Sequence, residues 1–177
     1  MNKVPTREEA LRLLERAGCS SSVIEHCKAV TSLALKLAEQ LADSGVGVNM
    51  SLVEAGGILH DIGRSKTHDV SHGYKGSQIA KALQLPDELI RIIERHVGAG
   101  IPTSEAVGIG MPERDYIPET LEEKIIAYAD SLIDSNRRES FEASLANFSR
   151  RLGRGHPAVE RFKKLHTEMS KLMRTEL

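Results

Sequence analysis

The sequence of 177 residues contains no tryptophan, and aromatic residues make up only 3% of it. A hydrophobic core must therefore be built from leucine, isoleucine, valine and alanine. The two cysteines, Cys19 and Cys27, are too few for a disulfide framework. We expect a cytoplasmic protein, in which both thiols are reduced. One disulfide between them is the alternative.

Long apolar runs and a strong net charge are also missing. No segment approaches the roughly 20 apolar residues of a membrane span, and the polar start, MNKVPTREEA, is unlike a signal peptide. The formal net charge is −1, so the chain lacks the positive surplus that holds long nucleic acid. The composition indicates a globular protein with neither a membrane nor long DNA or RNA as its partner.

Hydrophobic residues recur at helical spacing along nearly the whole sequence, and strand or hairpin patterns are missing. Capping boxes predict helix starts at Thr6, Ser22, Ser51 and Thr120. Residues 97–119 are richer in glycine and proline and are predicted to be irregular, with one turn at SEAVG. We predict an all-α fold of about seven to nine helices in one compact domain over residues 1–177, with an N-terminal helix at 6–17 and C-terminal helices at 138–175.

The stretch GGILHDIGRS, residues 56–65, places His60 and Asp61 inside an apolar run. A buried carboxylate costs several kcal/mol unless it is paired. On one continuous helix these two side chains would point about 100° apart, so an ion between them could be reached by both. Gly56 and Gly57 each cost roughly 1 kcal/mol within a helix, which predicts the close approach of another helix or of a ligand beneath His60.

Three further histidines and one aspartate lie in similar settings. His26 is on or beside the apolar stripe of its helix, His72 opens a helix, His96 ends another, and Asp130 stands in the apolar segment IIAYADSLID. Taken singly, each is typical of a hydrogen-bonded core residue. Taken together, one shared metal site would satisfy all of these buried imidazoles and carboxylates.

The order His26, His60–Asp61, Asp130 resembles the HD superfamily of metal-dependent phosphohydrolases, in which HDIG is the commonest form of the central pair. His72 and His96 match the two extra histidines of its dinuclear members. The segments SHGYKGSQIAKAL and LEEKIIAYADSLIDSNRR also resemble the family, the second its bacterial hydrolases of diadenosine polyphosphates. The likeness runs from about residue 20 to 138, with the terminal helices packed on this core, and is best to an archaeal-type branch of small HD proteins.

The resemblance implies one or two divalent transition metal ions, with Fe, Mn, Co, Ni and Zn all suited to nitrogen and oxygen ligands. It implies that a first ion is held by His26, His60, Asp61 and Asp130. Asp61 would bridge to a second ion, held also by His72 and His96. The implied activity is hydrolysis of a nucleotide or another small phosphoester by a metal-activated water, with Asp61 and Arg64 as catalytic residues.

Basic residues are the candidates for binding the substrate phosphate. Arg64 stands where many dinuclear members have lysine, and arginine binds phosphate in bidentate fashion; Lys75 and Arg137 are the other candidates. Ordinary surface cations are the alternative, which we favour for Lys66 and Arg138. We expect His68, His156 and His166 not to bind metal. The last helix carries an apolar stripe that is expected in the core, with a homodimer contact as the alternative: Phe162, Leu165, Met169 and Leu172.

Two other functions fit the same residues. Some HD proteins use this six-ligand set to hold two irons and activate oxygen, so the ligands alone leave an oxygenase open. The other alternative is a non-catalytic module that senses a nucleotide, although such a module would not need six metal ligands.

Overall fold

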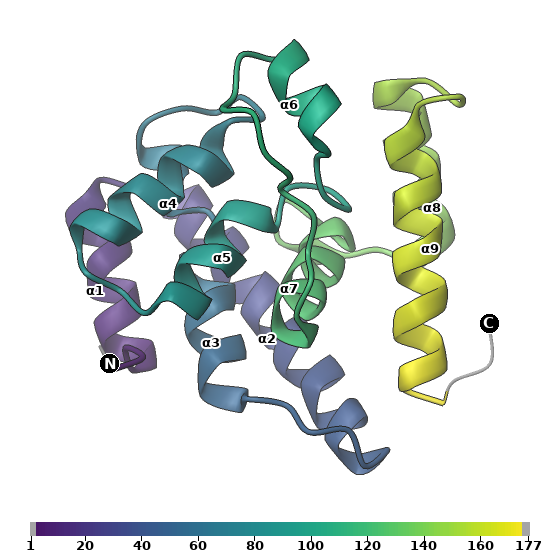
Figure 1. Cartoon of the computed structure of the whole chain (residues 1–177). Helices are drawn as coiled ribbons and strands as arrows, with labels where there is room; N and C mark the ends of the chain where they lie inside the picture. Colours follow the sequence, from purple (N-terminus) through teal and green to yellow (C-terminus); the bar gives the residue numbers. More distant parts are fainter. Residues whose placement is uncertain (1–2, 175–177) are drawn as a thin grey trace.

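The computed structural model describes residues 3–174, which form nine α-helices, one 3-10 helix and a two-stranded antiparallel sheet (Figure 1). The all-α prediction is confirmed. No helix in residues 3–174 is long and apolar enough to cross a membrane. The elements, in chain order, are α1 (Arg7–Ala17), α2 (Ser21–Asp43), α3 (Met50–Leu59), the 3-10 helix η1 (Ile62–Ser65), α4 (His72–Ala82), α5 (Asp87–Arg95), α6 (Thr103–Gly108), α7 (Leu121–Ser131), β1 (Ile133–Asp134), β2 (Arg137–Arg138), α8 (Phe141–Leu152) and α9 (Pro157–Leu172).

Two of the four predicted helix starts are confirmed by their caps. The Thr6 side chain accepts from the backbone N–H of Glu9, whose carboxylate accepts from that of Thr6, and Thr120 caps α7. The other two starts were predicted two residues too late. Ser20 rather than Ser22 caps α2, and Asn49 rather than Ser51 caps α3, because in each case an earlier side chain already accepts from the third N–H of the helix.

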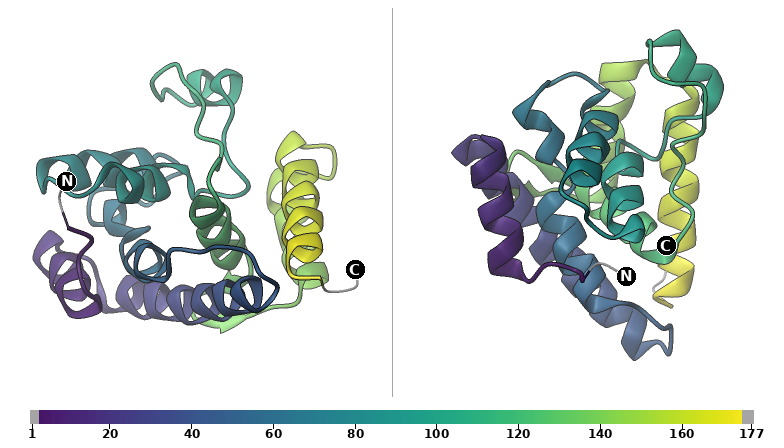
Figure 2. Two further views of the ribbon diagram at one scale, coloured as in Figure 1. Left: turned by 60° about the horizontal axis from the view of Figure 1, so that its bottom comes forward. Right: turned by 60° about the vertical axis from the view of Figure 1, so that its left-hand side comes forward.

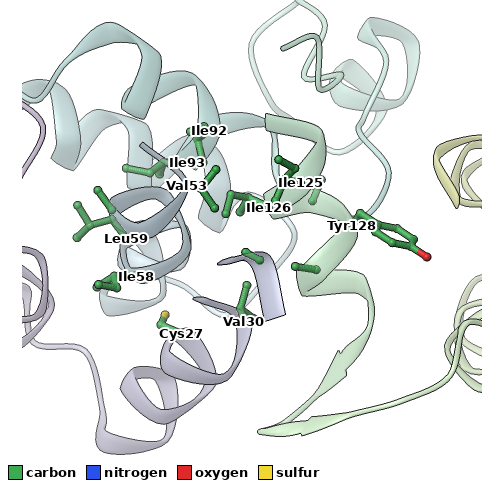
Figure 3. Packing of buried hydrophobic residues seen from close by; sticks show 14 of the residues in the cluster. Cys27, Val30, Val53, Ile58, Leu59, Ile92, Ile93, Ile125, Ile126 and Tyr128 are labelled. Carbon is green, nitrogen blue, oxygen red and sulfur yellow. The ribbon is translucent and has the colours of Figure 1, made fainter. Parts of the chain in front are cut away.

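The core is aliphatic, as the composition predicted. It lies where α2, α3, α5 and α7 meet, and Figure 3 shows two isoleucine pairs there, one from α5 and one from α7. Cys27 is buried among them, and Cys19 is half-buried; both are free thiols, so the disulfide alternative is wrong.

The last two helices, α8 and α9, form a hairpin. It lies to one side of the other helices, and α9 packs against α7 (Figures 1 and 2). Phe162, Leu165 and Met169 are buried in the same core, which confirms the predicted role of the stripe. His166 stacks on Phe141 with their ring centroids 3.6 Å apart, and its Nδ1 lies 2.6 Å from the Tyr128 hydroxyl. The predicted end of the last helix at residue 175 lies outside the described residues.

The β1–β2 hairpin was missed from sequence, because strands of two residues are too short to show an alternating pattern. Its turn contains Ser135, whose φ of 57° is in the left-handed region. Conformations of this kind cost free energy in a residue other than glycine and often occur at functional sites. Residues 97–119 are mostly irregular as predicted, apart from the short helix α6.

The helix through HDIG is interrupted, contrary to the prediction of one continuous helix. α3 ends at Leu59, His60 caps it, and Asp61 leaves the helical conformation with φ −98° and ψ 15° before η1 begins. Gly56 faces the side chains of Ile92 and Ile126, and Gly57 packs against the side chain and Cα of Thr31. Neighbouring helices, rather than a ligand, therefore approach these two glycines.

Gly63 marks the closest backbone approach beside the HD pair. A Cβ atom there would clash with the carbonyl oxygen of His72 and would lie 2.5 Å from the backbone nitrogen of Gly76. No side chain can replace this glycine without moving η1 away from α4. The turn after Asp61 and the start of α4 are therefore fixed relative to each other.

We expect Gly63→Ala to lower the free energy of unfolding by about 3 kcal/mol, because backbone atoms cannot rotate away from the added methyl group. Urea denaturation of the metal-free protein measures this change. Gly47→Ala is the matched control, since a Cβ at Gly47 meets nothing within 4 Å. An equal effect of both substitutions would contradict the proposed role of the close approach.

Candidate metal centre

Six side chains from five parts of the fold converge at one place. His26 comes from α2, and His60 and Asp61 follow α3. His72 begins α4, His96 caps α5, and Asp130 lies near the end of α7. The structure therefore brings together every residue that the sequence suggested as a metal ligand. The side chains of His60 and His96 are fully buried, whereas those of His26 and Asp130 are 18% and 21% exposed.

All four imidazoles are oriented in the same way. In each, Nδ1 lies 2.6–2.8 Å from a backbone carbonyl oxygen. A carbonyl oxygen can only accept a hydrogen bond, so Nδ1 carries a proton and Nε2 is the atom left to bind a metal ion. Such bonds are how proteins fix the tautomer and ring direction of a metal-binding histidine. The carbonyl partners of His26, His60, His72 and His96 are those of Ser135, Gly57, Asp69 and Ile93, respectively.

The first group of ligand atoms faces the open side of the site. Asp130 Oδ1 lies 2.9 Å from His26 Nε2 and 3.6 Å from His60 Nε2. Asp61 Oδ2 lies 3.9 Å from each of these nitrogens. We call this the outer group.

The second group lies deeper. Asp61 Oδ1 is 3.1 Å from His72 Nε2 and 3.4 Å from His96 Nε2, and the two nitrogens are 3.0 Å apart. We call this the inner group. The two oxygens of Asp61 therefore face different groups.

The inner group has the spacing of ligands around one metal ion, because atoms about 2.1 Å from an ion lie roughly 3.0–3.4 Å apart for bond angles between a right angle and a tetrahedral angle. The outer group is wider, with Asp61 Oδ2 3.9 Å from both nitrogens. The Nε2 lone pairs of His72 and His96 face each other, which is unfavourable unless a cation or a proton lies between them. In addition, His60 Nε2 and Asp61 Oδ1 are buried and make no hydrogen bond within the described residues. Buried polar atoms without a partner are rare, and a divalent cation would satisfy both.

The pKa values of Asp61 and His26 also bear on metal binding. Burial alone would raise the pKa of Asp61, but His60 and His72 hold that pKa well below its usual value. Burial would lower the pKa of His26, yet Asp130 beside it raises the pKa to about 9. A proton and a metal ion would thus compete for Nε2 of His26, so metal affinity should fall as the pH is lowered.

Two cavities open on the site. The first, of about 660 Å³, is lined by polar residues of α2 and the β1–β2 turn together with His26 and Asp61; we call it the polar cavity. The second, of about 650 Å³, lies between His72, the segment 97–109 and the α8–α9 hairpin; we call it the apolar cavity. Three residues line both: Arg64, Asp130 and Arg151.

The predicted substrate-binding residues are placed differently. Arg64 lines both cavities, and its Nε donates to Asp61 Oδ2 over 2.6 Å. Lys75 and Arg137 are exposed and are not among the described residues that line either cavity. The same holds for Lys66 and Arg138. His156 caps α9, with Nδ1 accepting from the backbone N–H of Ala158.

Sequence reasoning missed two features of the site. Arg151 is far along the chain from the HD pair, and only the tertiary fold places it by both cavities. The Ser135 carbonyl was missed because it belongs to the undetected turn. A local signal exists for the other carbonyls, since His60, His72 and His96 each lie three residues after the carbonyl that accepts from Nδ1.

Residues 23–133 match the HD domain family, and the chain belongs to this family. An uncharacterized protein of Methanocaldococcus jannaschii is 44% identical over 167 residues, covering 94% of this chain and 98% of that protein. A tRNA (cytidine(56)-2'-O)-methyltransferase of Picrophilus torridus is 36% identical over 98% of this chain. This chain spans only 49% of the length of that relative. The fold is also that of the HD domain of the L. monocytogenes phosphodiesterase PgpH in complex with cyclic-di-AMP, with a TM-score of 0.54, 17% identity, and coverage of 95% of this chain and 98% of that chain.

We expect purified protein to contain a transition metal and to melt at a lower temperature after chelation, because the ligand set exists only in the folded state. Asp61→Asn should lose most of this metal, since the residue faces both groups. Elemental analysis and thermal melts measure the two effects. Asp43→Asn, an exposed residue at the end of α2, is the control. Less than about a tenth of an ion per chain in untreated protein would contradict the prediction.

Proposed function

We propose that this protein is a metal-dependent phosphohydrolase that acts on a small nucleotide phosphoester. The observation that carries the proposal is a group of four ligand atoms and a group of three, joined by the two oxygens of Asp61 and lying beside two open cavities. In this assignment His26, His60, Asp61 and Asp130 hold a first ion, and Asp61, His72 and His96 hold a second. Bound divalent ions would polarise a phosphoryl oxygen and lower the pKa of a water molecule.

The protein residues around the ligands have separate roles. The four carbonyl-bound imidazoles present Nε2 inward without rotation of the rings, which is preorganisation of the kind that catalysis requires. Arg64 uses Nε to orient Asp61. Its Nη1 lies 3.4 Å from the His68 carbonyl oxygen, a long hydrogen bond. The guanidinium can therefore also donate to a phosphate in either cavity.

Several observations support a nucleotide as the substrate. The PgpH domain of the same fold is a phosphodiesterase in complex with a cyclic dinucleotide, and the Picrophilus torridus relative is named for an activity on tRNA. The net charge of −1 favours a small substrate over long RNA, whose binding depends on many phosphate contacts. The free nucleotide is therefore our first choice.

Metal-loaded protein should release phosphate or a nucleoside monophosphate in a screen of mononucleotides, dinucleoside polyphosphates and cyclic dinucleotides. Each substrate is offered with Mn²⁺, Fe²⁺, Co²⁺, Ni²⁺ and Zn²⁺ in turn, and transfer RNA serves as the long substrate. Turnover of a small phosphoester with none of tRNA is the expected result. If no phosphoester is cleaved but oxygen is consumed with an organic substrate, the oxygenase assignment replaces this one.

We expect Arg64→Ala to lower kcat/KM for the preferred phosphoester about tenfold, equivalent to about 1.4 kcal/mol of transition-state stabilisation. The reason is the loss of both the Asp61 hydrogen bond and a phosphate donor. Lys66→Ala removes a nearby exposed cation that lines neither cavity and should leave kcat/KM unchanged. Equal kinetics of the two variants would show that Arg64 is only a surface cation.

A further inference from the structure

The α8–α9 hairpin lies beyond residues 23–133, which match the HD family, yet it forms part of both cavities. Arg161 of α9 fixes this position. Its guanidinium makes a bidentate ion pair with Glu105 of α6, over 2.8 and 2.6 Å, and donates from Nε to the carbonyl oxygen of Gly100 over 3.1 Å. The hairpin is thereby held against the segment that follows His96.

Arg151 is the cation that this hairpin brings to the site. It is exposed, it lines both cavities together with Asp130, and it makes no hydrogen bond or ion pair with any described residue. Arg64 and Arg161, which also line the apolar cavity, are both engaged with carboxylates. An anion that reaches the ligand groups therefore meets one guanidinium whose charge no carboxylate neutralises, and arginine can bind phosphate through two parallel hydrogen bonds.

An apolar wall stands beside Arg151. Phe148, one helical turn earlier, packs over the backbone of Gly98, with its Cζ 3.2 Å from where a Cβ would lie. Leu152, Ile109 and Val70 line the same cavity and remain 42%, 47% and 41% exposed. Large apolar side chains gathered in a cavity beside an unpaired cation are typical of a site for a flat apolar group linked to an anion.

We propose that the hairpin forms a nucleotide subsite, in which Arg151 binds the phosphate at the ligand groups and the wall of Phe148, Leu152, Ile109 and Val70 covers the base. The volume of about 650 Å³ accommodates a mononucleotide. The identity of the phosphate compound rests on the proposed function. The new element is that Phe148, Arg151 and Leu152, which lie outside the HD match, complete a subsite that selects a substrate with a base.

The experiment measures binding rather than turnover. The probes are two phosphonates with a non-hydrolysable P–C bond, namely the analogue of AMP with its 5′ oxygen replaced by CH₂ and the same analogue of ribose 5-phosphate. Calorimetric titration of Mn²⁺-loaded protein should give a Kd for the AMP analogue about tenfold lower than that for the base-free analogue.

Two variants separate the phosphate contact from the base contact. Arg151→Ala should weaken both analogues by a similar factor of about tenfold, because both carry the phosphonate. Leu152→Ser should weaken only the AMP analogue and reduce the preference to about threefold or less. Arg150→Ala and Leu83→Ser are the matched controls, an adjacent arginine and a leucine of 39% exposure, and neither residue lines either cavity. The controls should change each Kd less than about twofold.

Equal affinity of the wild type for the two analogues, or no binding of either, would overturn the base subsite. Unchanged affinity in Arg151→Ala would overturn the phosphate contact. If the expected binding pattern is found and no phosphoester is hydrolysed, the nucleotide subsite stands and the hydrolase proposal fails.

Discussion

The carboxylate of Asp61 is the interaction on which the rest of the site depends. It is 3% exposed, and its two oxygens are shared between a pair of imidazoles on each side. An isolated buried carboxylate is strongly unfavourable, and an ion pair with Arg64 offsets only part of that cost. Metal ions in both groups would compensate the charge and satisfy the unpaired Oδ1 at the same time.

The fold is arranged to present this carboxylate. The helix α3 ends at Leu59, and Asp61 leaves the helical conformation and places Oδ1 in the inner group. Gly63 then lets η1 pack against the start of α4, which carries His72. Near the ends of α3 and α5, backbone carbonyl oxygens accept hydrogen bonds from Nδ1 of His60 and His96. Carbonyl groups in the last turn of a helix have no partner within that helix, and here they orient the metal ligands.

Much of this arrangement could be predicted from the sequence, and the parts that could not have physical reasons. Hydrophobic spacing and capping residues predicted most of the helices, and the adjacent His60 and Asp61 in an apolar run indicated the metal ligands. The break after His60 was not predictable, because it depends on how closely η1 packs on α4. Nor was the choice among basic residues: Lys75 is near His72 in sequence and lines neither cavity, whereas Arg151 is distant in sequence and lines both. Proximity along the chain is a poor guide to a long side chain's direction.

The central claim, that Asp61 joins two separate metal positions, is tested most directly by counting ions in His72→Ala. Elemental analysis of Mn²⁺-saturated protein, after removal of weakly bound metal, should give about two ions per chain for the wild type. The variant should retain about one, because His72 contributes only to the inner group and the outer group stays intact. Loss of both ions together, or no loss at all, would contradict the account.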